Sequence, residues 1–394
     1  MHFDHHADLS HPQPDHLAHS QHTERPHGKG GLLMSELVLA RAPWWRRLYA
    51  ELTRSPLSAV LNIAALIAIV LVLTPFVSWA LIDATWIGSS GDACPVTGGA
   101  CWAFIGAKLR LILFGRFPYE DQWRALFGAI ILVALVVLSL NPAFWRKWLL
   151  AVWGVGLGAY GILMWGGVFG LSYVESSLWG GLPLTILLTV FGVSFGLVLS
   201  VPIALARQSK LPVFKTASII FVEAVRGVPL ISVLFMASVL LPLILPDGFT
   251  PGGLGRVLIG LVLFLAAYMA EVLRGGLQAI PNGQYEACRS LGISYWPMIL
   301  KVILPQAFET VLPAMVNLFI GALKGTSLVV IVAMMDLLGA AQAALADPKW
   351  IGFYVETYVF AGLIYALMCG SISWYGRQTE KLLRDMRGNS NDRG

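Results

Sequence analysis

The chain has 394 residues, of which 57% are hydrophobic and only 12% are charged, and its net charge is +5. Soluble domains carry about 25% charged residues, so this composition excludes a soluble globular protein and predicts a polytopic membrane protein. The surplus of cations is typical of the cytoplasmic loops of such proteins, and no segment resembles a nucleic-acid-binding module, so nucleic acid is not an expected partner.

Residues 1–34 form a polar segment that holds all eight histidines of the chain. The segment has no apolar core, so it is predicted to be a disordered cytoplasmic tail and not a signal peptide. A histidine-rich tract can bind transition metals weakly, but a solvated tail without a defined role is the favoured interpretation, and no metal site is predicted. Residues 35–54 combine aromatic and cationic side chains, which is typical of a short helix at the cytoplasmic membrane surface.

Residues 35–179 are expected to form an N-terminal membrane extension. Three apolar segments in it are long enough to span the membrane: 57–82, 125–140 and 148–171. The third is rich in glycine, which permits close packing of helices; these glycines are at positions 154, 156, 158, 161, 166 and 167.

A long loop at 83–124 joins the first two spans. It contains an amphipathic piece, 104–114, that is expected to lie on the membrane surface. With a cytoplasmic N-terminus the loop is periplasmic, where a disulfide between Cys94 and Cys101 is allowed. The sequence alone leaves the disulfide and two free thiols equally open.

Residues 180–377 contain five further apolar segments, at 182–206, 216–245, 256–280, 307–340 and 353–375. Cations flank these segments on one side of the membrane, and the positive-inside rule therefore places both the loop 281–306 and the tail 378–394 in the cytoplasm. Eight spans also put both termini there. The predicted fold class is an all-α polytopic membrane protein with three N-terminal helices followed by a five-helix core.

Two acid–base pairs, Glu223 with Arg226 and Glu271 with Arg274, lie near the cytoplasmic ends of predicted spans. A charge at the centre of a span costs about 2.5–3.5 kcal/mol. A spacing of three residues puts each pair on one helical face, where its charges neutralise each other. They are therefore interpreted as structural ion pairs, and the alternative is that they brace the cytoplasmic loop or line a translocation path.

The segment 307–340 is too long for one straight helix, and a break is expected at 324–327. Broken helices at membrane depth tend to line a cavity, and a cation with hydroxyls and free backbone N–H groups suits a carboxylate. The candidate pathway residues are Lys324, Thr326, Ser327 and, as a secondary candidate, Asn317. The alternative is a helix bend in which Lys324 pairs with Asp336 or Glu309.

The loop 281–306 is amphipathic, and Pro297 predicts a break between two short helices. Gly292 predicts either a tight turn or a close approach by a partner. Within the loop stand Glu286-Ala287-Cys288, then Gly292, then Val302-x-Leu304-Pro305.

This pattern resembles the EAA loop of bacterial ABC-importer permeases, E-A-A-x3-G-x9-I-x-L-P, with Cys and Val at two positions where the pattern has Ala and Ile. In that family the loop docks on the ATPase subunit. The resemblance therefore implies an ATPase-coupling role for Glu286, Ala287, Gly292, Leu304 and Pro305.

The resemblance covers residues 180–377, which correspond to a type I permease core. The stretches F-V-E-A-V-R-G-V-P-L and A-E-V-L-R-G-G are similar to those of polar amino-acid permeases, and the added N-terminal spans look like the general L-amino-acid importers of Gram-negative bacteria. The resemblance implies an inner-membrane permease subunit that works with ABC ATPase subunits, a second homologous permease, a periplasmic amino-acid-binding protein and membrane lipid.

The sequence contains no G-x-x-x-x-G-K-[ST] phosphate-binding loop, so ATP and magnesium are expected on the partner ATPase and no cofactor on this chain. No catalytic triad is present, because every histidine lies in the N-terminal tail, and the chain is not expected to be an enzyme. An ion-gradient-driven secondary transporter would show inverted repeats and midplane carboxylates, and a scaffold would not need this cytoplasmic loop. The favoured function is ATP-driven import of L-amino acids from the periplasm.

Overall fold

The computed structural model describes residue 52 and residues 55–94, 98–140, 148–246 and 250–391. The predicted tail at 1–34 and almost all of the predicted surface helix at 35–54 lie outside this part of the chain. The structure forms two compact units, residues 1–77 and 78–394. In the first, α3 (Pro56–Val77) is an apolar helix of 22 residues, which is long enough to span a membrane.

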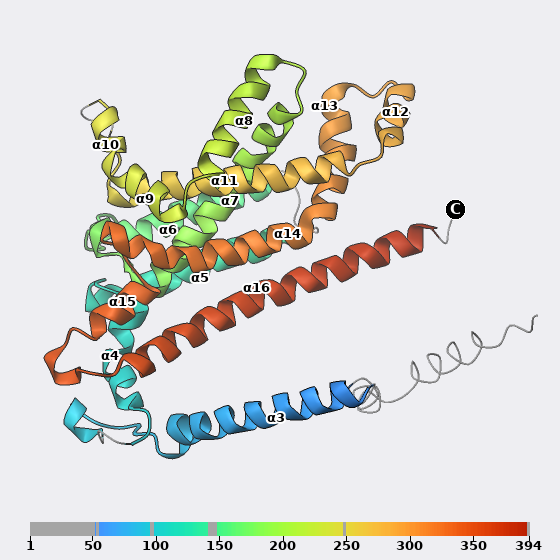
Figure 1. Cartoon of the computed structure of the whole chain (residues 1–394). Coiled ribbons are helices and arrows are strands. Elements are labelled where there is room, and N and C mark those ends of the chain that lie inside the picture. Colours follow the sequence, from blue (N-terminus) through green and yellow to red (C-terminus); the bar gives the residue numbers. More distant parts are fainter. Residues whose placement is uncertain (1–51, 53–54, 95–97, 141–147, 247–249, 392–394) are drawn as a thin grey trace, which may run out of the picture. The chain divides into compact units, whose positions relative to one another are not determined.

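The second unit is built almost entirely of helices (Figure 1). The residues before 180 form α4 (Trp102–Phe114), α5 (Gln122–Leu140) and α6 (Trp148–Trp165). The core that follows begins with α7 (Gly181–Arg207), α8 (Pro212–Arg226), α9 (Leu230–Val239), α10 (Leu241–Ile244) and α11 (Gly253–Gln278). It ends with α12 (Asn282–Ser290), α13 (Tyr295–Met298), α14 (Leu304–Gly325), β1 (Met335–Asp336), α15 (Leu337–Ala344) and α16 (Tyr354–Asn391).

Within the described residues, seven helical segments are long and apolar enough to cross a membrane, or eight if the bent pair α8–α9–α10 is one span. The predicted all-α polytopic class is therefore confirmed. The predicted boundaries of the four domains stay predictions. The predicted C-terminal tail at 378–394 is helical as far as Asn391, because α16 continues through it.

The core of the second unit is centred on α11, which packs against both α7 and α14; the three helices are close together in Figure 1. Small residues allow this contact. A Cβ at Gly196 of α7 would lie 3.0 Å from the Cβ of Leu265, and one at Gly276 would lie 2.8 Å from the carbonyl oxygen of Ala307. The three backbones therefore approach closely without the packing loss that larger side chains would impose.

The segment predicted as one span at 216–245 is bent by 106° between α8 and α9. Gly227 caps α8, and Pro229, which has an extended ψ of 143°, precedes α9. Proline has no N–H to donate and disfavours a helical conformation in the residue before it. The break therefore follows from Gly227 and Pro229, which the sequence contains.

The amphipathic piece at 104–114 forms most of α4. Phe104, Ile105 and Ile112 are covered by the rest of the second unit, whereas Leu109 and Arg110 are exposed. The covered face packs against α15 and the start of α7, and the expected location on the membrane surface stays a prediction.

Among the glycines of α6, Gly156 provides the predicted close packing against a neighbouring helix. A Cβ at Gly156 would lie 2.7 Å from the side chain of Leu135 on α5, whereas Gly154 and Gly158 have nothing within 4 Å. The span itself ends at Trp165 and not at residue 171.

The break predicted at 324–327 is present. The α-helix α14 ends at Gly325, and the chain continues as a 3-10 helix from Thr326 to Val332. Ala333 then adopts a left-handed conformation with φ of 60°, and this residue turns the chain toward α15.

Candidate functional site

The predicted loop at 281–306 consists of α12, a turn at Gly292, α13 and a π-helical turn at Ile299–Ile303 that leads directly into α14. Gly292 has φ of 69°. Its N–H donates to the carbonyl of Arg289 (3.0 Å), and the N–H of Ile293 donates to that of Cys288 (3.0 Å). These two bonds are the Schellman arrangement that ends a helix with a left-handed residue.

The sequence predicted the break between the two short helices from Pro297, but the break is at Gly292. Pro297 is in the first turn of α13, after the N-cap residue Ser294. The first N–H groups of a helix have no partner within it, so a proline there removes no hydrogen bond.

The loop has a face packed on its own chain and a face that nothing in the second unit covers. The packed face includes Cys288, Met298 and Ile299, each 5% exposed or less. On the other face, Leu291 is 78% exposed and Trp296 is 61% exposed. Large apolar side chains left uncovered at a polar surface are typical of a docking site for another protein.

The five residues of the EAA-like pattern are spread over this loop. Glu286, Ala287, Gly292 and Pro305 are exposed, and Leu304 is half-buried at the start of α14. The side chain of Gln306 donates to that of Gln284 (3.2 Å), so α14 is tied to α12 by a hydrogen bond. Tyr285, which belongs to α12, is half-buried, and this burial raises the pKa of its hydroxyl.

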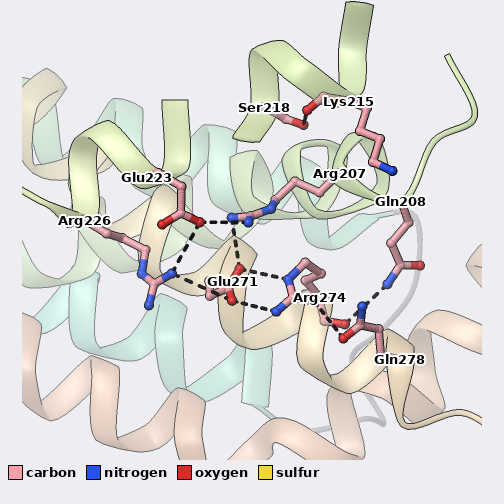
Figure 2. Close-up of polar contacts among 9 residues, drawn as sticks. All are labelled: Arg207, Gln208, Lys215, Ser218, Glu223, Arg226, Glu271, Arg274 and Gln278. Atoms are coloured by element: carbon pink, nitrogen blue, oxygen red, sulfur yellow. Dashed lines mark hydrogen bonds and ion pairs between the residues drawn. The ribbon is translucent and has the colours of Figure 1, made fainter. Parts of the chain in front are cut away.

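A network of charged side chains lies where α11 leads into this loop (Figure 2). Its centre is Arg207, the last residue of α7, whose side chain is 10% exposed. Its guanidinium lies 2.9 Å from Glu223 Oε1 and 2.9 Å from Glu271 Oε2. Arg207 therefore joins two carboxylates that belong to different helices, α8 and α11.

The two predicted ion pairs are parts of this one network. Arg274 contacts Glu271 through two nitrogens, at 2.9 and 2.7 Å, as predicted from their spacing. Arg226, in contrast, lies 4.0 Å from Glu223 and 3.7 Å from Glu271. The Glu223–Arg226 distance is thus the longest in the network. The nearest cation to Glu223 is Arg207, at 2.9 Å.

Three arginines and two glutamates give this network a net charge of +1, and it fastens the ends of α7, α8 and α11 to one another. Buried charges are tolerated only when they are paired and hydrogen-bonded. The sequence reasoning missed Arg207 because it considered pairs within one helix. The available signal was an arginine at the end of a span, which was attributed to the positive-inside rule alone.

The four candidate pathway residues do not converge. Lys324 and Asn317 are exposed on α14, and the Ser327 hydroxyl donates to the carbonyl of Lys324 (2.8 Å). Thr326 is fully buried, and its hydroxyl lies 3.4 Å from that of Tyr365 on α16.

Thr326 adjoins a buried polar cluster centred on Asp336. The Tyr365 hydroxyl donates to Asp336 Oδ2 (2.6 Å), and the Gly339 N–H donates to Oδ1 (2.9 Å), which makes Asp336 the N-cap of α15. Among the described residues, Asp336 is therefore satisfied by Tyr365 and Gly339 and not by Lys324, in contrast to the alternative derived from the sequence. The signal for this role was an aspartate directly before Leu-Leu-Gly-Ala-Ala.

Cys94 and Cys101 form a disulfide with their Cα atoms 5.8 Å apart, and Cys288 and Cys369 are free. Of the two alternatives that the sequence left open, the structure therefore has the disulfide. It closes the loop that leads into α4.

Comparison with known proteins gives three similarities. Residues 192–385 match the family described as binding-protein-dependent transport system inner membrane component. The chain is 43% identical to the inner membrane amino-acid ABC transporter permease protein YhdY of Escherichia coli (strain K12), over 78% of this chain and 84% of that protein. It is 33% identical to the glutamate/glutamine/aspartate/asparagine transport system permease protein BztC of Rhodobacter capsulatus, over 87% of this chain and 94% of that protein.

Among solved structures, the chain is similar to an amino acid ABC transporter crystallised with histidines. The TM-score is 0.45 and the sequence identity is 30%, over 51% of this chain and 91% of that one.

Proposed function

The chain belongs to the family of binding-protein-dependent transport system inner membrane components, and from that premise we propose that it is the permease subunit of an ATP-driven importer of L-amino acids. Amino acids with polar side chains are among its proposed substrates. The similarity to BztC, whose name specifies glutamate, glutamine, aspartate and asparagine, supports this substrate class. Transport runs from the periplasm to the cytoplasm, and both termini are cytoplasmic.

The observation that carries this proposal is the exposed face of the loop at 281–306. Glu286, Leu291 and Trp296 project from a loop that is otherwise packed on its own chain. An uncovered apolar patch with a nearby acidic side chain fits a groove on a second protein. That protein is proposed to be the ATPase subunit, which also carries ATP and magnesium.

The proposed assembly has two ATPase subunits, a second permease similar to this one, and a periplasmic amino-acid-binding protein. Closure of the ATPases displaces α12, and the connections of α12 to α11 and α14 transmit the displacement. The network around Arg207 then moves the ends of α7 and α8 together with α11. The two states differ in free energy because the loop contacts the ATPases differently in each.

The first test is purification of the full chain in a mild detergent, followed by mass spectrometry of the bound proteins. An ATP-binding subunit and a second permease in nearly equal amounts are expected. A chain that purifies alone and still takes up amino acids under a proton or sodium gradient would instead be a secondary transporter, and the proposal would be wrong.

A site-specific crosslink provides a second test. Cys288 is 5% exposed and therefore cannot report on a partner, whereas its exposed neighbour Ala287 can. A photoreactive residue at 287 is expected to capture the ATPase subunit. The same residue at Lys349, in the loop before α16, is the matched control and is expected not to capture it.

A further inference from the structure

We propose that one part of the chain holds another in a fixed position during transport. The part that holds is called the brace and comprises residues 83–94 and 98–114. The part that is held is called the hairpin and comprises α15 and the loop at 345–353. Lys108, Asp347, Cys101 and Glu356 are the proposed positioning residues. The brace lies outside the region matched by the transport family, which begins at residue 192. The statement about transport rests on the proposed function, and the statement about the hairpin does not.

The first contact is apolar. Phe104 of α4 is fully buried, and its ring centroid lies 5.8 Å from that of Trp350 and 5.8 Å from that of Phe353. On α15, Ala341 and Ala344 are also fully buried and belong to the same cluster as Phe104 and Ile112. The helices α4 and α15 lie side by side in Figure 1. Burial of this aromatic side chain removes apolar surface from water and so stabilises the contact.

The second contact is polar and joins the brace to the hairpin and to the start of α16. Lys108 Nζ forms an ion pair with Asp347. The Cys101 N–H donates to Glu356 Oε1 (3.0 Å), and the Glu356 side chain is buried at the start of α16. A buried carboxylate that loses its donor carries a large desolvation cost. This contact therefore fixes the start of α16, which directly follows the hairpin.

The third contact is made by the segment from Thr85 to Gly91, which precedes the disulfide. The backbone of Thr85 exchanges hydrogen bonds with Ala100 and Ala103, so this segment folds back on the start of α4. A Cβ at Gly91 would lie 3.0 Å from the carbonyl oxygen of Lys349, so the backbones of brace and hairpin approach as closely as glycine allows. The Cys94–Cys101 disulfide ties the chain just after this segment to the N-cap residue of α4.

The brace is anchored at its other end on α7. Gly181, the first residue of α7, has φ of 64°, and a Cβ there would lie 2.2 Å from the carbonyl oxygen of Leu113. In addition, the Thr185 hydroxyl accepts a hydrogen bond from the Leu337 N–H (3.0 Å). The hairpin is therefore held between α4 and α7, and it cannot follow a movement of α14 unless these contacts break.

If α14 moves while the hairpin stays in place, the segment that connects α14 to the hairpin must change its conformation. The connecting segment is the 3-10 helix from Thr326 to Val332 and the left-handed Ala333. A 3-10 helix has poorer hydrogen-bond geometry than an α-helix and often marks a hinge. The hairpin thus stays with the outer end of α7 while α14 moves.

Hydrogen–deuterium exchange of the full chain in detergent tests the brace without any partner. Three variants are compared with the unsubstituted chain: Lys108→Met, the double variant Cys94→Ser with Cys101→Ser, and Lys349→Met. The first two are expected to accelerate exchange at residues 337–353 by about tenfold or more, with no change in α12 and α13. Lys349, exposed in the same loop, is the matched control and is expected to leave exchange unchanged.

Unchanged exchange in the hairpin of both brace variants would overturn the proposal, as would equal acceleration in the hairpin and in α12. If the double cysteine variant fails to fold, the unsubstituted chain treated with a mild reductant replaces it, and if Lys108→Met fails to fold, Asp347→Asn replaces it as the variant that removes the ion pair. Reversal of the ion pair by Lys108→Asp with Asp347→Lys is expected to restore slow exchange, and failure to restore it would exclude the ion pair from the brace.

The transport statement is tested in the assembled importer by the number of amino acids taken up per ATP hydrolysed. This ratio is expected to fall in Lys108→Met and to stay unchanged in Lys349→Met. An unchanged ratio with a loosened hairpin would show that the fixed position does not matter for transport. If the chain binds no ATPase at all, the proposed function fails while the exchange result stands.

Discussion

Gly292 shows how one residue determines the shape of the loop at 281–306. It ends α12 with φ of 69° and a Schellman pair of hydrogen bonds, and nothing lies within 4 Å of the position of a Cβ. The glycine is therefore required by its backbone conformation and not by crowding. A non-glycine residue in this region costs roughly 1–2 kcal/mol, and a β-branched residue costs more.

We expect Gly292→Val to abolish uptake while the chain still inserts into the membrane. The substitution strains the turn, so that α12 and its exposed face point away from the ATPase subunit. Gly283→Val is the matched control, because Gly283 lies in the same loop, in α12, and is also uncrowded. The measurement is amino-acid uptake, divided by the amount of each variant that is inserted in the membrane. Normal uptake in Gly292→Val would falsify the coupling role of this turn.

Arg207 shows that a single side chain can connect two pairs that the sequence presents as separate. Its removal leaves Arg274 on Glu271, but Glu223 keeps only the 4.0 Å contact to Arg226. We therefore expect Arg207→Met to destabilise the chain by roughly 1–3 kcal/mol. Thermal melting in detergent measures this loss as a lower Tm.

Lys210→Met is the control for Arg207→Met, since Lys210 is an exposed cation three residues further along the chain. It is expected to leave Tm unchanged, because exposed charges contribute little to stability. Equal Tm values for the two variants would mean that the network contributes nothing beyond its net charge.

At the scale of elements, glycine and proline place two breaks in the membrane helices. Gly227 and Pro229 separate α8 from α9 by a bend of 106°. Gly325 ends α14, and the 3-10 helix after it leads to the N-cap Asp336 of α15. Backbone N–H groups next to each break still find acceptors: that of Gly227 donates to the carbonyl of Glu223, and that of Gly339 donates to Asp336. Backbone groups inside a membrane need such partners because lipid offers none.

The ion pair between Lys108 and Asp347 makes the contact between brace and hairpin dependent on pH. The hydrogen bond from Lys108, together with that from the Lys349 N–H, holds the pKa of the Asp347 carboxyl below its ordinary value. A depressed pKa in the folded chain stabilises it above the unfolded-state pKa of about 3.9. This contribution disappears as pH falls through the folded-state value.

We therefore expect the Tm difference between the unsubstituted chain and Lys108→Met to be constant from about pH 7 to pH 5 and to shrink below about pH 4. Melting curves at several pH values measure it. A difference that stays the same down to the lowest pH would show that Lys108 contributes through the packing of its methylene groups and not through Asp347.

At the scale of the second unit, the loop at 281–306 and the brace lie at opposite ends of the helices α7 and α11. The network around Arg207 is at the end of α7 that adjoins the loop, and Gly181 is at the end that adjoins the brace. Under the proposed orientation, the first end faces the cytoplasm and the second faces the periplasm.

Cysteine labelling tests this orientation. In a chain with Cys288→Ser and Cys369→Ser, we expect Leu291→Cys to react with an impermeant maleimide only in inside-out vesicles. Ile87→Cys is expected to react only from the periplasmic side. Both positions are well exposed, at 78% and 90%, so accessibility within the chain limits neither reaction. Labelling of both from the same side would contradict the predicted topology.

The sequence by itself determined the class of protein, the position of most spans and the turn at Gly292. These features are local: apolar runs of about 20 residues, the pairing of residues three apart, and the backbone preferences of glycine and proline. The resemblance of the loop to a transport family likewise rested on a spacing within 20 residues, from Glu286 to Pro305.

The tertiary structure alone decided which partners those residues have. The short contact of Glu223 comes from Arg207, 16 residues away, and Leu337 donates to Thr185, 152 residues away. Cys101 contacts Glu356 across 255 residues, and the amphipathic segment at 104–114 packs against α15, more than 220 positions further along the chain. Spacing along the chain predicts the face on which a side chain lies, but the partner on that face depends on how distant helices pack, because non-local contacts form only when the whole chain folds.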